Sequence, residues 1–244
     1  MIKIIAAIRR RLGMTHAEYL LYIEHVHGRM SRAKPLGLAR YVQNHVIDAA
    51  FGATGDHAHL TVLPRDSVTE LCFEDFAALR RTFADDYTRT VIGPDGVNFS
   101  EQSSALNLMT ASSGEDPGIG EGRLKVLFFL KAAEGAGGQA FQAQWAAASA
   151  RADHLQGAAV LGNVRDAPLP PPAAASERAG GGDDYFGSVG QIVYDGVQSL
   201  WFDEAAAPAA VRRWEAVFTR DSAGWLDRSR SFWLLAREVE ILRI

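Results

Sequence analysis

Short stretches of sequence recur in the same order in the two halves of this chain. Each match is weak alone, but four matches in one order are difficult to obtain by chance, and a repeat constrains the fold more than any local pattern. The matched stretches are Met1–Ala7 with Leu124–Leu130, Val42–Ala49 with Val160–Ala167, Val68–Asp75 with Val197–Glu204, and Ala78–Arg81 with Ala210–Arg213. The 244 residues are therefore expected to hold two copies of one module.

A polar, glycine-rich stretch at 112–122 has the composition of a linker and separates the copies. We expect a first module at 1–111 and a second, degenerate module at 123–244. A further Pro/Gly-rich stretch at 168–190 falls where the second copy should connect its second and third strands. It is expected to form a surface loop.

The first copy predicts two helices and four strands. Thr15 and Glu18 form a T-x-x-E capping box, which marks the start of a helix. The expected elements are a strand at 2–10, a helix at 15–33, strands at 38–46 and 66–74, a helix at 75–87, and a strand at 105–110. This βαββαβ order is typical of a ferredoxin-like module, whose antiparallel sheet carries both helices on one face.

The other face of such a sheet needs a partner, because a bare sheet leaves apolar surface in water. Two fused modules can stack these faces on each other. The predicted fold class is therefore α+β: two fused ferredoxin-like modules that form an intramolecular pseudo-dimeric α+β barrel.

Composition and missing motifs exclude several classes of function. The net charge of −4 argues against a nucleic-acid partner, and no run of 18 apolar residues predicts a membrane span. The single cysteine, Cys72, rules out an internal disulfide and is expected to be a small buried hydrophobe. No phosphate loop, G-x-G-x-x-G, G-x-S-x-G or H-E-x-x-H motif is present. With no secretory h-region at the start, a cytoplasmic protein is expected.

The first helix carries the residues of greatest chemical interest. At 100° per residue, one continuous stripe faces the sheet, and His25 lies on the opposite, solvent side. The stripe contains Tyr19, Leu20, Tyr22, Ile23, Val26, His27 and Met30. His27 is therefore expected to point toward the sheet.

Two interpretations of His27 remain open. It is either a core histidine bonded to a nearby carbonyl or hydroxyl, or a general acid/base in a small cavity. Tyr22 likewise either orients a ligand hydroxyl or packs as a half-buried ring.

The two copies differ in composition. Six of the seven histidines lie in the first copy and all five tryptophans in the second. Aligned by sequence, Trp145 falls at Tyr22, Ala150 at His27, and Asn163 at His45. The first copy is therefore expected to be open and the second filled.

His57 and His59 form an H-x-H pair, a spacing found in some metal sites when the segment is a strand. The pair needs a third ligand, which nothing in the sequence specifies. A loop role, a substrate-lining role and a metal role stay open, and no metal site is predicted.

The stretches Tyr22–Gly28, Tyr41–His45 and Glu70–Phe73 resemble the EthD-domain family of dimeric α+β barrels. Members commonly carry an aromatic residue followed five residues later by His-Gly-Pro, and here Arg29 stands in place of the proline. The family is linked to bacterial degradation of ethyl tert-butyl ether. Similar barrels include cofactor-free monooxygenases, lactone isomerases, polyketide cyclases and haem-dependent enzymes.

The resemblance implies a cavity between the helices and the sheet of the first copy. It implies catalytic roles for His27 and Tyr22. The residues expected to bind the substrate are Tyr19, Ile23, Met30, Tyr41, His45, Glu70 and Phe73.

The leading hypothesis is a cofactor-independent isomerase, cyclase or dehydratase that acts on a small hydrophobic or aromatic oxygenated molecule. In it, His27 moves a proton and Tyr22 holds an oxygen. One alternative is a monooxygenase, either cofactor-free or with haem bound by His27 or His45. Another is a non-catalytic ligand-binding protein of a catabolic pathway. Dimerisation of the fused chain stays open.

Overall fold

The computed structural model describes residues 1–51, 65–156, 159–169 and 193–244. In the first half, a strand is followed by one long helical segment, two strands, a series of short helical turns, and a fourth strand. These elements are β1 (Ile2–Ile8), α1 (His16–Tyr22), the π-helix η1 (Ile23–His27), α2 (Gly28–Ala33), β2 (Leu38–Phe51), β3 (Ser67–Phe73), α3 (Phe76–Ala84), the π-helix η3 (Thr88–Ile92), α4 (Gly93–Asp95), the 3-10 turns η4 (Gly96–Asn98) and η5 (Gln102–Ser104), and β4 (Leu106–Glu115).

The second half repeats the order of strands and helices with fewer short turns. Its described elements are β5 (Arg123–Leu130), α5 (Gly138–Gln156), β6 (Gly162–Pro168), β7 (Gly196–Asp203), α8 (Ala207–Phe218) and β8 (Phe232–Arg243).

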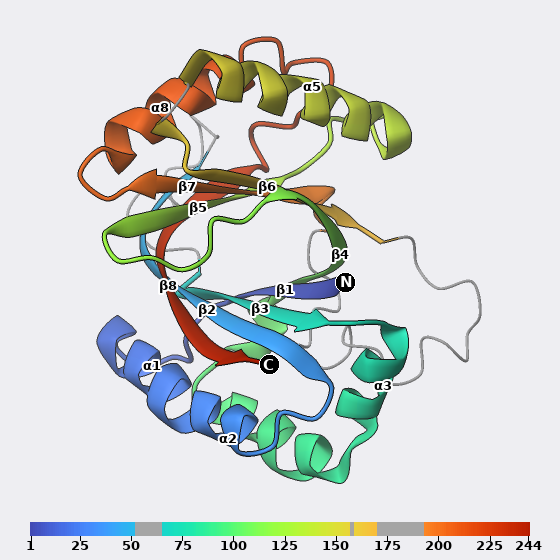
Figure 1. The fold of residues 1–244 in the computed structure, drawn as a ribbon, viewed down its shortest axis with the longest axis vertical. Helices are drawn as coiled ribbons and strands as arrows, with labels where there is room; N and C mark the ends of the chain where they lie inside the picture. Colours follow the sequence, from blue (N-terminus) through green and yellow to red (C-terminus); the bar gives the residue numbers. More distant parts are fainter. Residues whose placement is uncertain (52–64, 157–158, 170–192) are drawn as a thin grey trace.

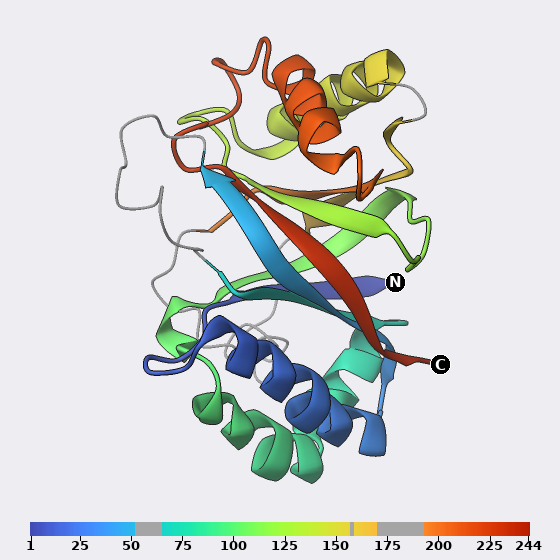
Figure 2. The same cartoon turned by 90° about the vertical axis from the view of Figure 1, so that its left-hand side faces the viewer.

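The eight strands form one closed antiparallel barrel in the order β1-β3-β2-β8-β5-β7-β6-β4. Each half contributes four adjacent strands, and the halves are joined by the ladders β2–β8 and β4–β6. Figures 1 and 2 show the barrel in the middle, with α1, α2 and α3 on one side and α5 and α8 on the other. The bare sheet faces of the two halves are therefore both turned into the barrel interior.

The barrel interior has an apolar end and a charged end. At the apolar end, Phe129 and Phe232 stack with their ring centroids 4.9 Å apart. At the charged end, Glu70 accepts hydrogen bonds from Lys125 and Asn44 and forms an ion pair with Lys3. Buried charges persist only when they are paired, and this network ties the first half to the second.

The two helix layers are packed differently. The second layer forms one continuous core in which Trp145, Trp214, Phe218 and Trp225 pack together with their neighbours. The first layer is split into two separate clusters. One contains Leu38, Phe73, Leu79 and Phe83, and the other contains Ala6, Ile8, Tyr19, Ile23 and Phe99.

Several expectations need correction at the level of elements. The expected helix at 15–33 is present with its capping box, but its middle is a π-helix. The helix after β3 ends at Ala84, and 88–98 add three helical turns that the sequence did not predict. Residues 112–115 of the expected linker belong to β4, which pairs with β6.

Two expectations lie outside the described residues: the role of His57 and His59, and nearly all of the loop at 168–190. No helix in the described part of the chain is long and apolar enough to span a membrane.

Candidate functional site

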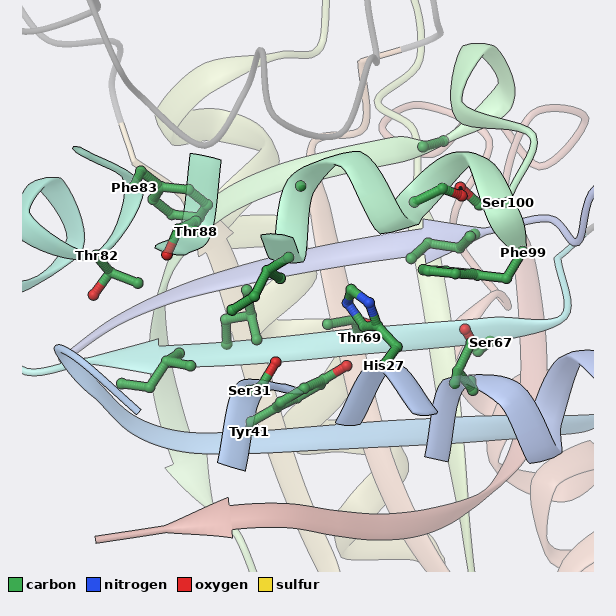
Figure 3. A pocket seen from close by; sticks show the side chains of 18 of the residues that line it. His27, Ser31, Tyr41, Ser67, Thr69, Thr82, Phe83, Thr88, Phe99 and Ser100 are labelled. Atoms are coloured by element: carbon green, nitrogen blue, oxygen red, sulfur yellow. Dashed lines mark hydrogen bonds between the residues drawn. The ribbon is translucent and has the colours of Figure 1, made fainter. Parts of the chain in front are cut away.

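A cavity of about 80 Å³ lies between the first helix layer and the barrel wall, where the two clusters of that layer separate. Its lining is mostly apolar, with several hydroxyl groups and one imidazole (Figure 3). The lining residues include Ile8, Tyr19, Ile23, His27, Ser31, Leu38, Tyr41, Ser67, Thr69, Leu71, Thr82, Phe83, Thr88, Ile92, Phe99, Ser100 and Gln102. An apolar cavity with a few polar groups is the usual form of a small-molecule site.

The π-helix η1 brings one row of side chains to the cavity. Tyr19, Ile23, His27 and Ser31 all line it at a spacing of four residues. In an α-helix, that spacing drifts by about 40° at each step, since 3.6 residues complete a turn. The wider π turn offsets this drift, and such turns are frequent at functional sites.

Gln43 supports the turn from the barrel wall. Its Nε2 donates to the carbonyl of Ile23 at 2.7 Å and to the hydroxyl of Tyr41 at 2.9 Å. One buried amide therefore fixes both the start of the π turn and the orientation of a cavity tyrosine.

His27 is held by a carboxylate from another segment. Its Nδ1 lies 2.9 Å from Oδ2 of Asp95, at the end of α4. Asp95 also accepts a bond of 2.6 Å from the hydroxyl of Tyr22 and one of 2.9 Å from Nδ2 of Asn98. The ring of His27 projects into the cavity (Figure 3), and its Nε2 makes no hydrogen bond to any described residue. The carboxylate thus fixes the ring and leaves the second nitrogen free to act on a ligand.

Asp95 is suited to this task because it stays ionised although it is buried. Burial alone would raise its pKa, but the hydrogen bonds from His27, Tyr22 and Asn98 lower the pKa to about 2. The pKa of Tyr22 is raised, first by loss of solvent and then by the bond to Asp95. The pKa of Tyr41 is raised to about 12 by burial. Both tyrosines are therefore hydrogen-bonding groups and not bases at neutral pH.

Four of the nine predicted site residues line the cavity: Tyr19, Ile23, His27 and Tyr41. Tyr22 does not. Its hydroxyl is bonded to Asp95, and its ring borders a shallow outer groove with Leu21 and His25. The geometry gives Tyr22 a supporting contact behind His27 and not the predicted contact with a ligand oxygen.

The other four predicted residues also lie outside the lining. Met30 is displaced by the π turn, and Ser31 takes the cavity position. His45 faces the helix layer, where its Nε2 meets Oε1 of Gln43 at 3.1 Å. Glu70 lies in the charged barrel interior. Phe73 packs on Phe83 in the neighbouring cluster.

The sequence did not identify Asp95, Asn98, Thr88 or Phe99. All four lie in the helical turns after α3, in a stretch punctuated by Gly93, Pro94 and Gly96 that has the composition of a loop. Phe99 packs on the ring of His27 with centroids 4.8 Å apart. No local pattern signals that this stretch folds back over the first helix.

The cavity does not suit haem in its present form. At about 80 Å³ it is several times smaller than the roughly 300–1,000 Å³ of pockets for drug-sized ligands. The described residues contain no group of three or more His, Cys, Asp or Glu side chains that could hold a metal ion.

Comparisons with known proteins agree with this architecture. Residues 11–103 match the family model of the EthD domain, a range that includes His27, Thr88 and Asp95. No curated protein matches the chain in sequence.

Solved structures with this barrel show the fold alone, because their sequence identity is low. A putative monooxygenase from Lactobacillus acidophilus NCFM is 9% identical with a TM-score of 0.52, over 99% of this chain and 94% of its own. A putative monooxygenase from Fusobacterium nucleatum subsp. nucleatum is 5% identical with a TM-score of 0.54, over 100% and 97%. A haem-binding protein from Thermus thermophilus is 10% identical with a TM-score of 0.46, over 98% of this chain and 92% of its own.

Proposed function

We propose that this chain is an EthD-like enzyme that moves a proton on a small, mostly apolar oxygenated molecule, with His27 as the general base and acid. The observation that carries the proposal is the 2.9 Å contact between Asp95 and His27 Nδ1, with Nε2 turned into an apolar cavity. The same pairing of a carboxylate with an imidazole keeps the proton on Nδ1 and the lone pair on Nε2.

In this reaction, Nε2 of His27 takes a proton from a carbon or hydroxyl beside a carbonyl group of the ligand. Asp95 stabilises the imidazolium that forms, and the imidazolium returns the proton at another atom. Isomerisation, cyclisation and dehydration all have this form. Proton transfer by a positioned group contributes about 10²–10⁴-fold in rate.

The proposal includes a tandem origin, with one module at 1–111 and another at 123–244. Strand register supports it. The first half contains the ladders β1–β4 and β2–β3, and the second contains β5–β8 and β6–β7. The residue pairs of the first two ladders coincide with those of the second two when Val42 is aligned with Val164 and Gly114 with Glu240. The pair Val42–Glu240 between the halves then becomes Val164–Gly114, which is also a pair in the barrel. Val164 therefore replaces Val160 as the counterpart of Val42 in the sequence alignment.

Only the first module keeps the site. The register that relates the halves places Gly196 at the position of Ser67, which lines the cavity. In the second layer the indole of Trp145 covers Gly196, and its Nε1 donates to Gln198 at 2.7 Å. The space that is open over the first sheet is thus filled by tryptophan over the second.

Two other functions use the same cavity. A cofactor-free monooxygenase would use His27 to deprotonate a ligand that then reacts with oxygen. The fold that this chain shares with the two putative monooxygenases supports this second function. A non-catalytic binding protein would bind the same ligands without turnover. Product analysis under air and under nitrogen separates the three.

The test is thermal melting of the wild type, His27→Ala and His25→Ala with phenols, lactones, quinones, short ethers and haem. His25 is the matched control, because its side chain is 60% exposed and it neighbours His27 in the same turn. A ligand that binds the native state raises the melting temperature. We expect a shift in the wild type and His25→Ala and none in a folded His27→Ala. A folded His27→Ala that still turns over the bound ligand would refute the role of His27.

A further inference from the structure

Thr82, Thr88 and Thr90 lie close together in the sequence, and of these three only Thr88 has a hydroxyl without a hydrogen-bond partner among the described residues. The Thr82 hydroxyl donates to the carbonyl of Ala78 at 2.9 Å, and the Thr90 hydroxyl donates to that of Asp86 at 2.7 Å. Oγ1 of Thr88 is fully buried and has no hydrogen-bond partner in the described part of the chain. The side chain lines the cavity from the π-helix η3, away from Phe99 and Ser67 (Figure 3).

A buried hydroxyl without a partner is costly. Leaving it unsatisfied destabilises the fold, whereas a ligand oxygen that bonds to it recovers this loss. An unpaired polar atom on a residue that lines an apolar cavity indicates where a ligand places an oxygen.

The charges around the cavity limit what that ligand can be. Of the described lining residues, Lys34 and His27 are the two that can carry positive charge, and each already has a carboxylate partner. Lys34 binds Asp85 through two contacts of 2.8 and 3.0 Å. An anionic ligand would therefore be buried without an unpaired cation, which is strongly unfavourable.

We infer that Thr88 anchors a neutral oxygen group, and that the ligand of this cavity is an uncharged, largely apolar carbonyl or hydroxyl compound. The inference rests on the proposed function, because it takes the cavity as the ligand site. It adds a specificity-determining residue and excludes carboxylates and phosphates as substrates.

The experiment compares dissociation constants, measured by NMR titration, for four probes: cyclohexanone and phenol as neutral oxygen compounds, toluene without oxygen, and benzoate as an anion. The proteins are the wild type, Thr88→Val, and the matched control Thr90→Val, whose hydroxyl already has a partner. We expect the wild type to prefer cyclohexanone and phenol. Thr88→Val should weaken both by about two- to tenfold and leave toluene unchanged. Thr90→Val should change none of them.

Thr88→Val has a second readout that needs no ligand. Since valine removes an unpaired buried hydroxyl and keeps the shape, the variant should melt at a higher temperature than the wild type. Weaker binding in a more stable protein separates a ligand contact from damage to the fold. A lower melting temperature for Thr88→Val would argue against an unpaired hydroxyl.

The outcomes also separate this inference from the proposed function. If Thr88→Val binds cyclohexanone and phenol as the wild type does while His27→Ala does not, the Thr88 subsite is wrong and the function stands. If Thr88→Val alone loses affinity, the subsite stands, and the role of His27 falls if His27→Ala also keeps turnover. If benzoate binds the wild type most tightly of the four probes, the inference that the ligand is uncharged is wrong. Failure of all four probes to bind the wild type overturns both proposals.

Discussion

Nδ1 of His27 lies 2.9 Å from Oδ2 of Asp95, although 68 residues separate them in the sequence. The first belongs to a π turn in the opening helical segment, and the second ends a short turn of helix after α3. Their contact fixes the orientation of the imidazole and makes it a candidate base.

The first prediction concerns the tautomer of His27. In the neutral ring the proton should reside on Nδ1, because the Asp95 carboxylate can only accept. Asp95→Asn weakens this preference, since an amide can also donate. Two-bond ¹H–¹⁵N NMR reports the tautomer directly, with the exposed His25 as an internal reference. A wild-type ring protonated on Nε2 contradicts the proposed base.

Tyr22 should contribute to stability through Asp95. Tyr22→Phe removes a hydrogen bond of 2.6 Å to a buried carboxylate and should cost about 1.5 kcal/mol in the free energy of unfolding. Tyr87→Phe is the matched control, because its hydroxyl reaches the carbonyl of Met30 only at 3.4 Å. Urea unfolding at pH 7 measures both, and equal losses would show that the bond to Asp95 is unimportant.

The same carboxylate predicts a pH dependence. The pKa of Asp95 is about 2 in the folded protein and about 3.9 for an aspartate in an unfolded chain. Its ionised form therefore stabilises the fold above about pH 4, and this contribution is lost as the pH falls toward 2. In Asp95→Asn the stability should fall less steeply across that window. Parallel unfolding curves for the two proteins would contradict the assigned shift.

Lys125 should be essential to the barrel. It is buried between Glu70 and Glu238, with Nζ 3.2 Å from Oε1 of Glu238. Lys125→Met removes the ion-pair partner of Glu238 and leaves Glu70 with Lys3, so it should cost about 3–5 kcal/mol. Combining it with Glu238→Gln should cost less than the sum of the single changes, because the removed charges are coupled. Additive losses in urea unfolding would show that the pair does not interact.

Gly196 should tolerate no side chain while Trp145 covers it. A Cβ at Gly196 would overlap the Trp145 ring, so Gly196→Ala should cost about 1–3 kcal/mol by overpacking. The cost should shrink in a Trp145→Phe background. Gly224→Ala is the control, since a Cβ there meets nothing within 4 Å. An undiminished cost beside phenylalanine would place the strain elsewhere.

Patterns that repeat locally were predictable from the sequence. The match of Val68–Asp75 with Val197–Glu204 lies in register on β3 and β7, because alternation along a strand survives divergence. Under the proposed equivalence of the halves, the match of Val42 with Val160 is shifted by four residues and that of Met1 with Leu124 by one, since these strands share little beyond alternating apolar positions.

The site was only partly predictable, for two physical reasons. A helical wheel assumes 3.6 residues per turn, so it could not place Met30 and Ser31 correctly beyond the π turn. Asp95 and Thr88 reach the cavity through tertiary folding of a glycine- and proline-containing stretch. That approach is set by packing and leaves no periodic signal in the sequence.

The ladders β2–β8 and β4–β6 also determine when each strand edge of the first half is covered as the chain is synthesised. A nascent chain that has released only its first half exposes two unpaired strand edges, which are prone to pair with other chains. The β4 edge gains its partner when β6 is released, but the β2 edge waits for β8, the last strand of the barrel to leave the ribosome. The closed barrel thus provides a partner for both edges, but the partner of β2 is the last to be made.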